Sequence, residues 1–133
     1  MCFFFKKKVL RGLHLQTKHS QGKYLTVLKG EIYDVAVDLR KNSKTFGKYF
    51  SINLSDINGK SIYIPPGFAH GFVGLKDENI ISYSCTNYRS QKHELGIKWN
   101  DEDIKIKWPI KKPILSFKDS KNISLQEYVK IHA

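Results

Sequence analysis

Short runs of alternating hydrophobic and polar residues fill most of the chain, and clusters of Gly, Asn and Lys separate them. Such alternation is typical of antiparallel strands, because successive side chains of a strand point to opposite faces. The pattern predicts strands at 24–28, 32–39, 48–54, 61–64, 71–75 and 79–86. Turns are predicted at Lys29-Gly30 and Asn58-Gly59, and we expect the first two strands to pair and the last two to form a hairpin.

The strand predicted at 32–39 has two different faces. One face carries Ile32, Asp34, Ala36 and Asp38, and the other carries Tyr33, Val35, Val37 and Leu39. Asp34 and Asp38 could serve as paired carboxylates in acid–base chemistry, but structural hydrogen bonding is the simpler interpretation.

The last third of the chain has a different pattern. Ile104, Ile106 and Trp108 alternate with lysines, which predicts an edge strand or an extended segment. Residues 124–127, Ser-Leu-Gln-Glu, form a capping box, and the apolar positions that follow have helical spacing. We therefore expect an all-β chain with one short C-terminal helix, which is typical of a barrel or a sandwich.

The size of the chain limits its organisation to one domain, 1–133. No apolar run approaches the ~20 residues that cross a bilayer, so no membrane association is expected. At the N-terminus apolar residues precede the lysines, the reverse of a signal peptide. Cys2 and Cys85 are too few for a disulfide framework, and we expect a cytoplasmic protein.

The formal charge of +11 calls for an anionic partner or a solvated surface. Arg11, Arg40 and Arg89 are the only arginines among 23 basic residues, and the lysines are scattered along the chain. Scattered lysine favours a solvated surface. No helix-turn-helix, zinc module or RNP motif supports nucleic-acid binding, so no nucleic-acid partner is expected.

Two stretches concentrate the residues that can carry chemistry. The first, 9–16, contains Arg11 and His14 and leads to Lys23; the second, 64–72, contains His70 and leads to Tyr83. The second has the P-x-G-x-x-H pattern that recurs in cupins, where the histidine points into the mouth of the barrel.

Many cupins use this histidine as a metal ligand together with an earlier His-x-His and a Glu. Here only separated histidines precede it, so neither a metal nor a metal site is expected. The histidines outside the two stretches are interpreted as hydrogen-bonded polar residues: His19, His93 and His132. Neither G-x-G-x-x-G nor a P-loop is present, and no cofactor is expected.

Motifs spread over residues 9–119 resemble those of the dTDP-4-dehydrorhamnose 3,5-epimerase family. The matching segments are Leu10-Arg11-Gly12-Leu13-His14, Gln21-Gly22-Lys23, 30–40, Ser43-Lys44-Thr45-Phe46-Gly47, 64–72, 94–101, Trp108-Pro109 and Leu115-Ser116-Phe117-Lys118-Asp119. The resemblance implies a cupin or jelly-roll β-barrel and a homodimer. It also implies a cofactor-free epimerase that inverts C3, C5 or both of a nucleoside-diphosphate 4-keto-6-deoxy sugar in rhamnose-type biosynthesis.

The resemblance also implies roles for single residues. His14 is the expected base, Asp119 its orienting carboxylate, and Tyr83 the acid on the opposite face of the sugar. Lys23 and His70 are expected near the ketone oxygen. The remaining expected substrate contacts are Arg11 at a phosphate or the sugar, Tyr88 near the nucleotide, and Lys118.

These residue types suit proton transfer next to a ketone. Removing that proton leaves an enolate, so the site needs a base and a donor for the oxygen. Histidine exchanges protons near neutral pH, and a carboxylate on its other nitrogen fixes the tautomer. A phenol on the far face then returns the proton with inversion.

The resemblance does not cover the N-terminal part of the family's members, because these carry a further sheet-forming segment before the Arg-Gly-Leu-His motif. Where relatives have a polar run, this chain has Phe3, Phe4 and Phe5, which could form a pocket wall, pair with a partner chain or fill the place of missing strands. Two other functions stay open: a 4-keto-sugar isomerase, and a non-catalytic nucleotide-sugar-binding or assembly module.

Overall fold

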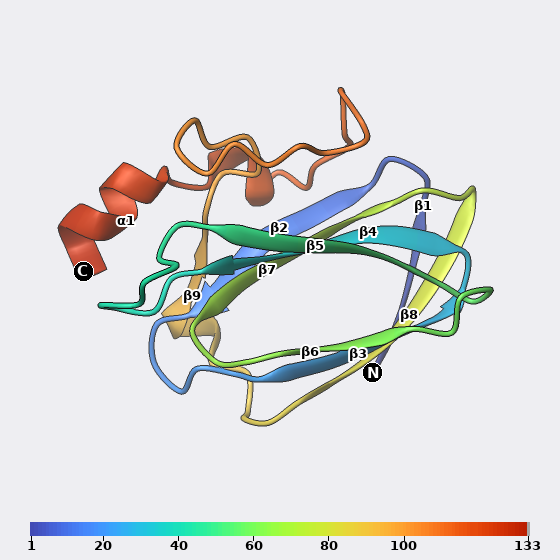
Figure 1. The fold of residues 1–133 in the computed structure, drawn as a ribbon, viewed down its shortest axis with the longest axis horizontal. Coiled ribbons are helices and arrows are strands. Elements are labelled where there is room, and N and C mark those ends of the chain that lie inside the picture. The colour runs from blue at the N-terminus through green and yellow to red at the C-terminus, as the bar shows by residue number, and fades with distance from the viewer. Residues whose placement is uncertain (133) are drawn as a thin grey trace.

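The computed structural model describes residues 1–132, which form two antiparallel sheets that face each other (Figure 1). The smaller sheet has the order β1 (Cys2–Lys6), β8 (Glu78–Cys85), β3 (Lys23–Lys29), β6 (Ser61–Ile64). The larger sheet has the order β5 (Tyr49–Ser55), β4 (Glu31–Asp38), β7 (Phe68–Gly74), β2 (Leu10–Gln16), β9 (Glu94–Gly96). Two short 3-10 turns, η1 (Gln91–His93) and η2 (Asp119–Lys121), and helix α1 (Leu125–His132) complete the structure. The predicted all-β class with a C-terminal helix is confirmed.

The predicted pairing of neighbouring strands was wrong. β3 pairs with β6 and β8, whereas β4 pairs with β5 and β7, so the turn at Gly30 carries the chain from one sheet to the other. Likewise β7 and β8 lie in different sheets and form no hairpin. Alternation identifies the two faces of a strand but not its partner, since a short connection can cross between sheets as easily as it can turn within one.

Strand positions agree better than strand partners. β6 coincides with the predicted strand at 61–64, and the other predicted strands are shifted by one to three residues at their ends. The pattern missed β1, β2 and β9. The segment 104–108 forms no strand within the described residues, so the predicted edge strand is absent, and Ile104 ends a turn while Lys105 has a φ of +56°, so the segment is not uniformly extended.

β1 was missed because its phenylalanines hide the alternation. Phe5 is buried and packs on Phe72 across the two sheets, with ring centroids 5.0 Å apart, whereas Phe4 is 52% exposed on the outer face. The strand pairs with β8 through the register Phe4↔Ile80. Neighbouring phenylalanines of one strand therefore lie in different surroundings, Phe5 in the core and Phe4 on the surface.

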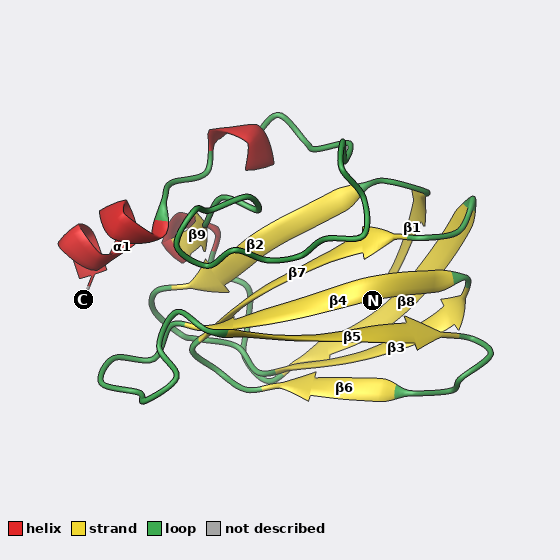
Figure 2. Cartoon of the chain, turned by 45° about the horizontal axis from the view of Figure 1, so that its top comes forward, coloured by secondary structure: helices red, strands yellow, loops and turns green. Residues whose placement is uncertain are grey.

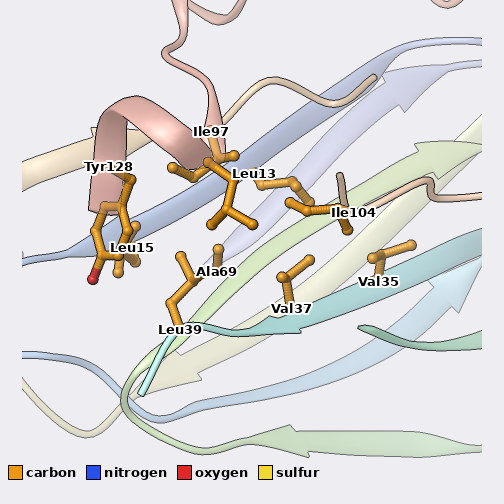
Figure 3. Packing of buried hydrophobic residues seen from close by; sticks show 10 residues of the cluster. Leu13, Leu15, Val35, Val37, Leu39, Ala69, Ile97, Ile104 and Tyr128 are labelled. Atoms are coloured by element: carbon orange, nitrogen blue, oxygen red, sulfur yellow. The ribbon is translucent and has the colours of Figure 1, made fainter. Parts of the chain in front are cut away.

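Two hydrophobic clusters lie on opposite faces of the larger sheet. The cluster between the sheets contains Phe5, Leu25, Val27, Ile32, Leu54, Phe72 and Ile81. The other cluster lies beneath α1 and the segments that follow β9 and contains Leu13, Leu15, Val35, Val37, Leu39, Ala69, Ile97, Ile104, Leu125 and Tyr128 (Figure 3). Figure 2 shows the long loop after β9 lying over β2 and β7, on the side away from β3 and β6. The two faces predicted for 32–39 are therefore both buried in β4, one in each cluster.

Asp38 on β4 has the structural role that the sequence favoured. Its carboxylate accepts hydrogen bonds from Arg40 Nε at 3.0 Å, Ser43 Oγ at 2.6 Å and Thr45 Oγ1 at 2.5 Å. The bond from Arg40, aided by those from the two hydroxyls, holds the pKa of Asp38 far below its ordinary value although burial opposes this. The group therefore fixes the loop after β4.

The capping box at the start of α1 is present. Ser124 N donates to Glu127 Oε1 at 3.2 Å, and Glu127 N donates to Ser124 Oγ at 3.1 Å. Leu125 and Tyr128 are buried against the larger sheet. No helix within residues 1–132 has the length and apolarity that a bilayer crossing needs.

Candidate functional site

A cavity of about 410 Å³ opens between the two sheets. Its lining comes from β1, β2, β3, β7, β8 and β9, from the loops that precede β3 and follow β8, and from η2 with the segment before it. The structure brings seven of the eight sequence-predicted residues to this cavity: Arg11, His14, Lys23, His70, Tyr83, Lys118 and Asp119. Tyr88 does not line it; its side chain is 91% exposed.

A bulge in β2 aims two of these side chains into the cavity. Arg11 and His14 are three positions apart, so in a regular strand they would point to opposite faces. The register of β2 on β7 shifts between them, from Arg11↔Phe72 to His14↔His70, and both face the cavity while Leu13 enters the outer core. Bulges commonly redirect side chains in this way next to active sites.

Gly12 makes the bulge possible. Its φ is +117°, and a Cβ there would lie 2.6 Å from the backbone oxygen of His70 and 2.7 Å from Gly71 Cα. Only glycine meets both conditions without displacing β7. Its amide also donates to Asp119 Oδ2 at 3.2 Å, which ties the bulge to the carboxylate.

His14 and Asp119 form a hydrogen-bonded pair at the cavity wall. His14 Nε2 lies 2.5 Å from Asp119 Oδ1, and the carboxylate is buried whereas the imidazole is 37% exposed. Asn122 Nδ2 donates to the same oxygen at 3.3 Å. Burial acts to raise the pKa of Asp119, but the hydrogen bond and charge of His14, with the bonds from Gly12 and Asn122, hold it below its ordinary value.

Tyr83 and Lys23 lie on the smaller sheet, across the cavity from His14. They come from neighbouring strands, β8 and β3, which pair through Leu25↔Tyr83 and Lys23↔Cys85. Burial raises the pKa of Tyr83 and lowers the pKa of Lys23, because the charged form of each group is poorly solvated. Tyr83 is therefore a neutral phenol near pH 7, and its hydroxyl donates to Met1 Sδ at 2.9 Å.

A second histidine–carboxylate pair lies beside the first. His70 Nε2 is 2.7 Å from Asp34 Oδ1, and both side chains are almost fully buried. Asp34 Oδ2 has no hydrogen-bond partner within residues 1–132. His70 faces His14 across the β2–β7 ladder, so the two imidazoles share one end of the cavity.

The cavity lining is rich in cations. Arg11 lies over the ring of Phe3, 4.7 Å from its centroid, and lines the cavity. Arg89 and Lys118 both pair with Glu94. A cavity with several guanidinium and ammonium groups suits an anionic ligand.

Sequence reasoning did not select Gln16, Asp34, Arg89 or Glu94 as site residues. Gln16 is 5% exposed and fastens two loops, since Nε2 donates to His19 O at 2.9 Å and Oε1 accepts from Ser90 N at 2.8 Å. A glutamine two positions after His14 could have been noticed, but nothing in the spacing joins Arg89 or Glu94 to the cavity.

Among residues 1–132, no group of three or more His, Cys, Asp or Glu side chains is arranged as a metal-binding cluster. His14 and His70 each bind one carboxylate instead. What the lining offers is proton transfer: two imidazole–carboxylate pairs, a phenol and a lysine around a space large enough for a sugar.

Comparison with known proteins finds a family that matches this chain. The profile of the family described as dTDP-4-dehydrorhamnose 3,5-epimerase matches residues 2–127. A relative of that name from Methanothermobacter thermautotrophicus is 53% identical over 102 residues, covering 77% of this chain. The chain spans 55% of the length of that curated relative.

Solved structures of similar proteins have the same fold. The crystal structure of dTDP-4-dehydrorhamnose 3,5-epimerase from Elizabethkingia anophelis superposes with a TM-score of 0.93 at 44% identity, over 96% of this chain and 71% of that one. An epimerase from Legionella pneumophila, solved in complex with dTDP-4-keto-L-rhamnose, gives a TM-score of 0.89 at 41% identity, over 95% of this chain and 69% of that one.

Proposed function

Because the chain belongs to the dTDP-4-dehydrorhamnose 3,5-epimerase family, we propose that it inverts C3, C5 or both of a dTDP-linked 4-keto-6-deoxy sugar. The observation that carries the proposal is the placement of a base and an acid on opposite walls. His14 lies on the larger sheet and is paired with Asp119 of η2, whereas Tyr83 lies on the smaller sheet, with the cavity between them. Inversion at carbon needs proton removal from one face and return to the other.

The first step is removal of a proton from a carbon next to the ketone. His14 accepts it, the C–H electron pair moves toward the carbonyl, and an enolate forms. Asp119 is buried and stays ionised because its pKa is held low, so it stabilises the imidazolium that His14 becomes. The carbonyl group itself makes the proton removable, and this chemistry needs no cofactor.

The negative charge of the enolate develops on the ketone oxygen. Lys23 supplies an N–H donor for that oxygen, and its low solvent access strengthens the interaction with that charge. The ring of His70 lies on the other side of the cavity with its Nε2 engaged by Asp34, so only a doubly protonated ring would offer the oxygen a second donor. Asp34 Oδ1 lies 2.7 Å from His70 Nε2 and holds the ring in place, and both side chains are almost fully buried.

The second step is proton return from the other face. The raised pKa of Tyr83 keeps the phenol protonated and ready to donate. Among residues 1–132 the hydroxyl donates to the thioether of Met1, a weak acceptor that a sugar can displace at small cost. Delivery of this proton to the enolate carbon completes inversion and leaves the ketone at C4.

The test is turnover of dTDP-4-keto-6-deoxyglucose in deuterium oxide, followed by NMR. We expect solvent deuterium at C3, C5 or both, inverted configuration at a labelled carbon, and a ketone that stays at C4. Migration of the ketone would identify a 4-keto-sugar isomerase instead. Binding of the nucleotide sugar with no deuterium incorporation would identify a non-catalytic binding or assembly module.

We further propose that a second copy of the chain covers the outer face of the smaller sheet. Phe4, Tyr24 and Tyr63 are each 52% exposed there, and Ile80 pairs with Phe4 beside them. Uncharged residues occupy the centre of this face, and Lys6, Lys29 and Glu78 lie at one end. In a chain of net charge +11, such a face lets two copies approach without strong repulsion.

Light scattering after gel filtration tests the homodimer. The wild-type protein should elute at twice the mass of the chain, and Tyr24→Lys with Tyr63→Lys should give the monomer. Phe50→Lys is the matched control, because this aromatic is 57% exposed on the other sheet and should leave the dimer intact. A monomeric wild type would contradict the proposal.

We also propose a cytoplasmic location, which the state of the cysteines supports. Both Cys2 and Cys85 are free and exposed, which suits the reducing cytoplasm, where we place the enzyme.

A further inference from the structure

Glu94 bridges two cations that come from different parts of the chain. Its carboxylate pairs with Arg89, which follows β8, and with Lys118, which precedes η2, at 3.3 Å from Lys118 Nζ. Glu94 itself begins β9 and is fixed by the register Gln16↔Glu94. Its side chain is 18% exposed, whereas those of Arg89 and Lys118 are 66% and 64% exposed.

All three side chains line the cavity, together with the active-site groups. The two cations share one carboxylate, so the cluster keeps a net positive charge. Both also keep N–H donors that Glu94 does not use. The other carboxylate of the lining, Asp119, is already engaged by His14 and Gly12 and does not neutralise this charge.

An exposed ion pair contributes little to protein stability, since solvent screens it and the side chains lose freedom. Stability alone therefore gives a weak reason to place a guanidinium and an ammonium on one carboxylate at a cavity. Holding them side by side does have value for binding: two cations that would otherwise repel and move freely are ordered before the ligand arrives.

We infer that Arg89 is a phosphate-binding residue of the site, and that Glu94 positions it beside Lys118 to receive the diphosphate of the nucleotide. The choice of ligand rests on the proposed function, in which the substrate carries two linked phosphates. A planar guanidinium offers paired N–H donors that match phosphate oxygens, and the adjacent ammonium meets the second phosphate as a point charge. Neither the family motifs nor the sequence pattern pointed to Arg89.

Calorimetric titration with dTDP, dTMP and thymidine tests the role of Arg89. In Arg89→Gln the dissociation constant of dTDP should rise about tenfold. That of dTMP should rise less, and that of thymidine should not change. Arg40→Gln is the matched control, because Arg40 also pairs with a carboxylate and is half exposed but lies away from the cavity. It should bind all three ligands as the wild type does.

A double-mutant cycle tests the role of Glu94. Arg89→Gln raises the dissociation constant of dTDP by some factor in the wild-type background. If Glu94 positions Arg89, the same substitution in the Glu94→Gln background should raise that constant by less than half of this factor. The cycle cancels the direct effect of removing the Glu94 charge. An equal factor in both backgrounds would show that Glu94 has no positioning role.

Other outcomes decide against the phosphate role of Arg89. Unchanged dTDP binding in Arg89→Gln, or an equal loss in Arg40→Gln, would overturn it, as would a wild type that binds neither dTDP nor inorganic pyrophosphate. Equal losses for dTDP and thymidine would show that the substitution disturbs the nucleoside site instead. Because binding is measured without turnover, a wild type that binds dTDP but does not epimerise would refute the proposed function and leave this inference intact.

Discussion

In the proposed mechanism Asp119 acts on the substrate only through the imidazole of His14, and the environment of its carboxylate is set by a few hydrogen bonds. Replacing it with asparagine keeps the shape of the group but removes the charge that stabilises an imidazolium. For Asp119→Asn we expect kcat to fall by about 10²–10³-fold with a change in KM below about threefold. Steady-state kinetics measures both quantities.

Asp56→Asn is the control for Asp119. Asp56 Oδ2 accepts a backbone hydrogen bond from Gly30 at 3.2 Å, just as Asp119 Oδ2 accepts one from Gly12, but Asp56 does not line the cavity. This variant should keep wild-type kinetics. An unaffected kcat in Asp119→Asn would show that the pair with His14 is structural only.

Asp38 gives a prediction about stability and pH. The pKa of Asp38 is lower in the folded protein than in the unfolded chain, where it is near 3.8. The ionised carboxylate therefore stabilises the fold at pH values above 3.8, and this contribution is lost as the pH falls below that value. Asp38→Asn should lower the free energy of unfolding by about 2 kcal/mol at pH 7. The deficit should shrink as the pH falls from about 5 to 2.5. Urea denaturation across this range measures the effect, and a deficit that does not change with pH would contradict the role of the charge.

At the scale of secondary-structure elements, the bulge in β2 is the feature on which the site depends. Alternation predicted strands at six places, but it could not reveal β2, because a bulge interrupts the period of two between Arg11 and His14. Leu10, Leu13 and Leu15 show the consequence: all three are buried although they do not alternate regularly. The same bulge aims Arg11 and His14 in one direction, which the sequence pattern alone would have excluded.

Gly12→Ala should therefore damage both fold and site. The new Cβ would meet the backbone of His70 and Gly71, and φ of +117° is strained for alanine. We expect a loss of about 2–4 kcal/mol in the free energy of unfolding, measured in urea, and a greater loss of activity than the unfolded fraction explains.

Gly59→Ala separates strain from crowding. Gly59 also has a positive φ, +63°, but a Cβ there has no neighbour within 4 Å. Gly59→Ala should lower the free energy of unfolding by about 1 kcal/mol and leave the activity unchanged. If Gly12→Ala and Gly59→Ala lost equal amounts of unfolding free energy, the close packing of β2 on β7 would not be the reason that position 12 needs glycine.

At the scale of the whole molecule, the two sheets bring together residues that are distant in sequence. His14 and Asp119 are separated by 105 positions, and His70 and Asp34 by 36. No periodicity or local spacing predicts such pairs; the resemblance to a family supplied the first pair, and only the three-dimensional structure supplied the second. The crossing of the chain between sheets, which the sequence pattern missed, is what places β2 and β8 on opposite walls (Figure 1).

In the proposed mechanism His14 removes a proton from one face of the sugar and Tyr83 returns one to the other face. Hydrogen–deuterium exchange at C3 and C5 of dTDP-4-keto-6-deoxyglucose, measured by NMR for His14→Asn and Tyr83→Phe, tests it most directly. We expect no exchange in His14→Asn, and exchange with impaired inversion at one or both centres in Tyr83→Phe. Exchange and inversion at near-wild-type rates in both variants would contradict it.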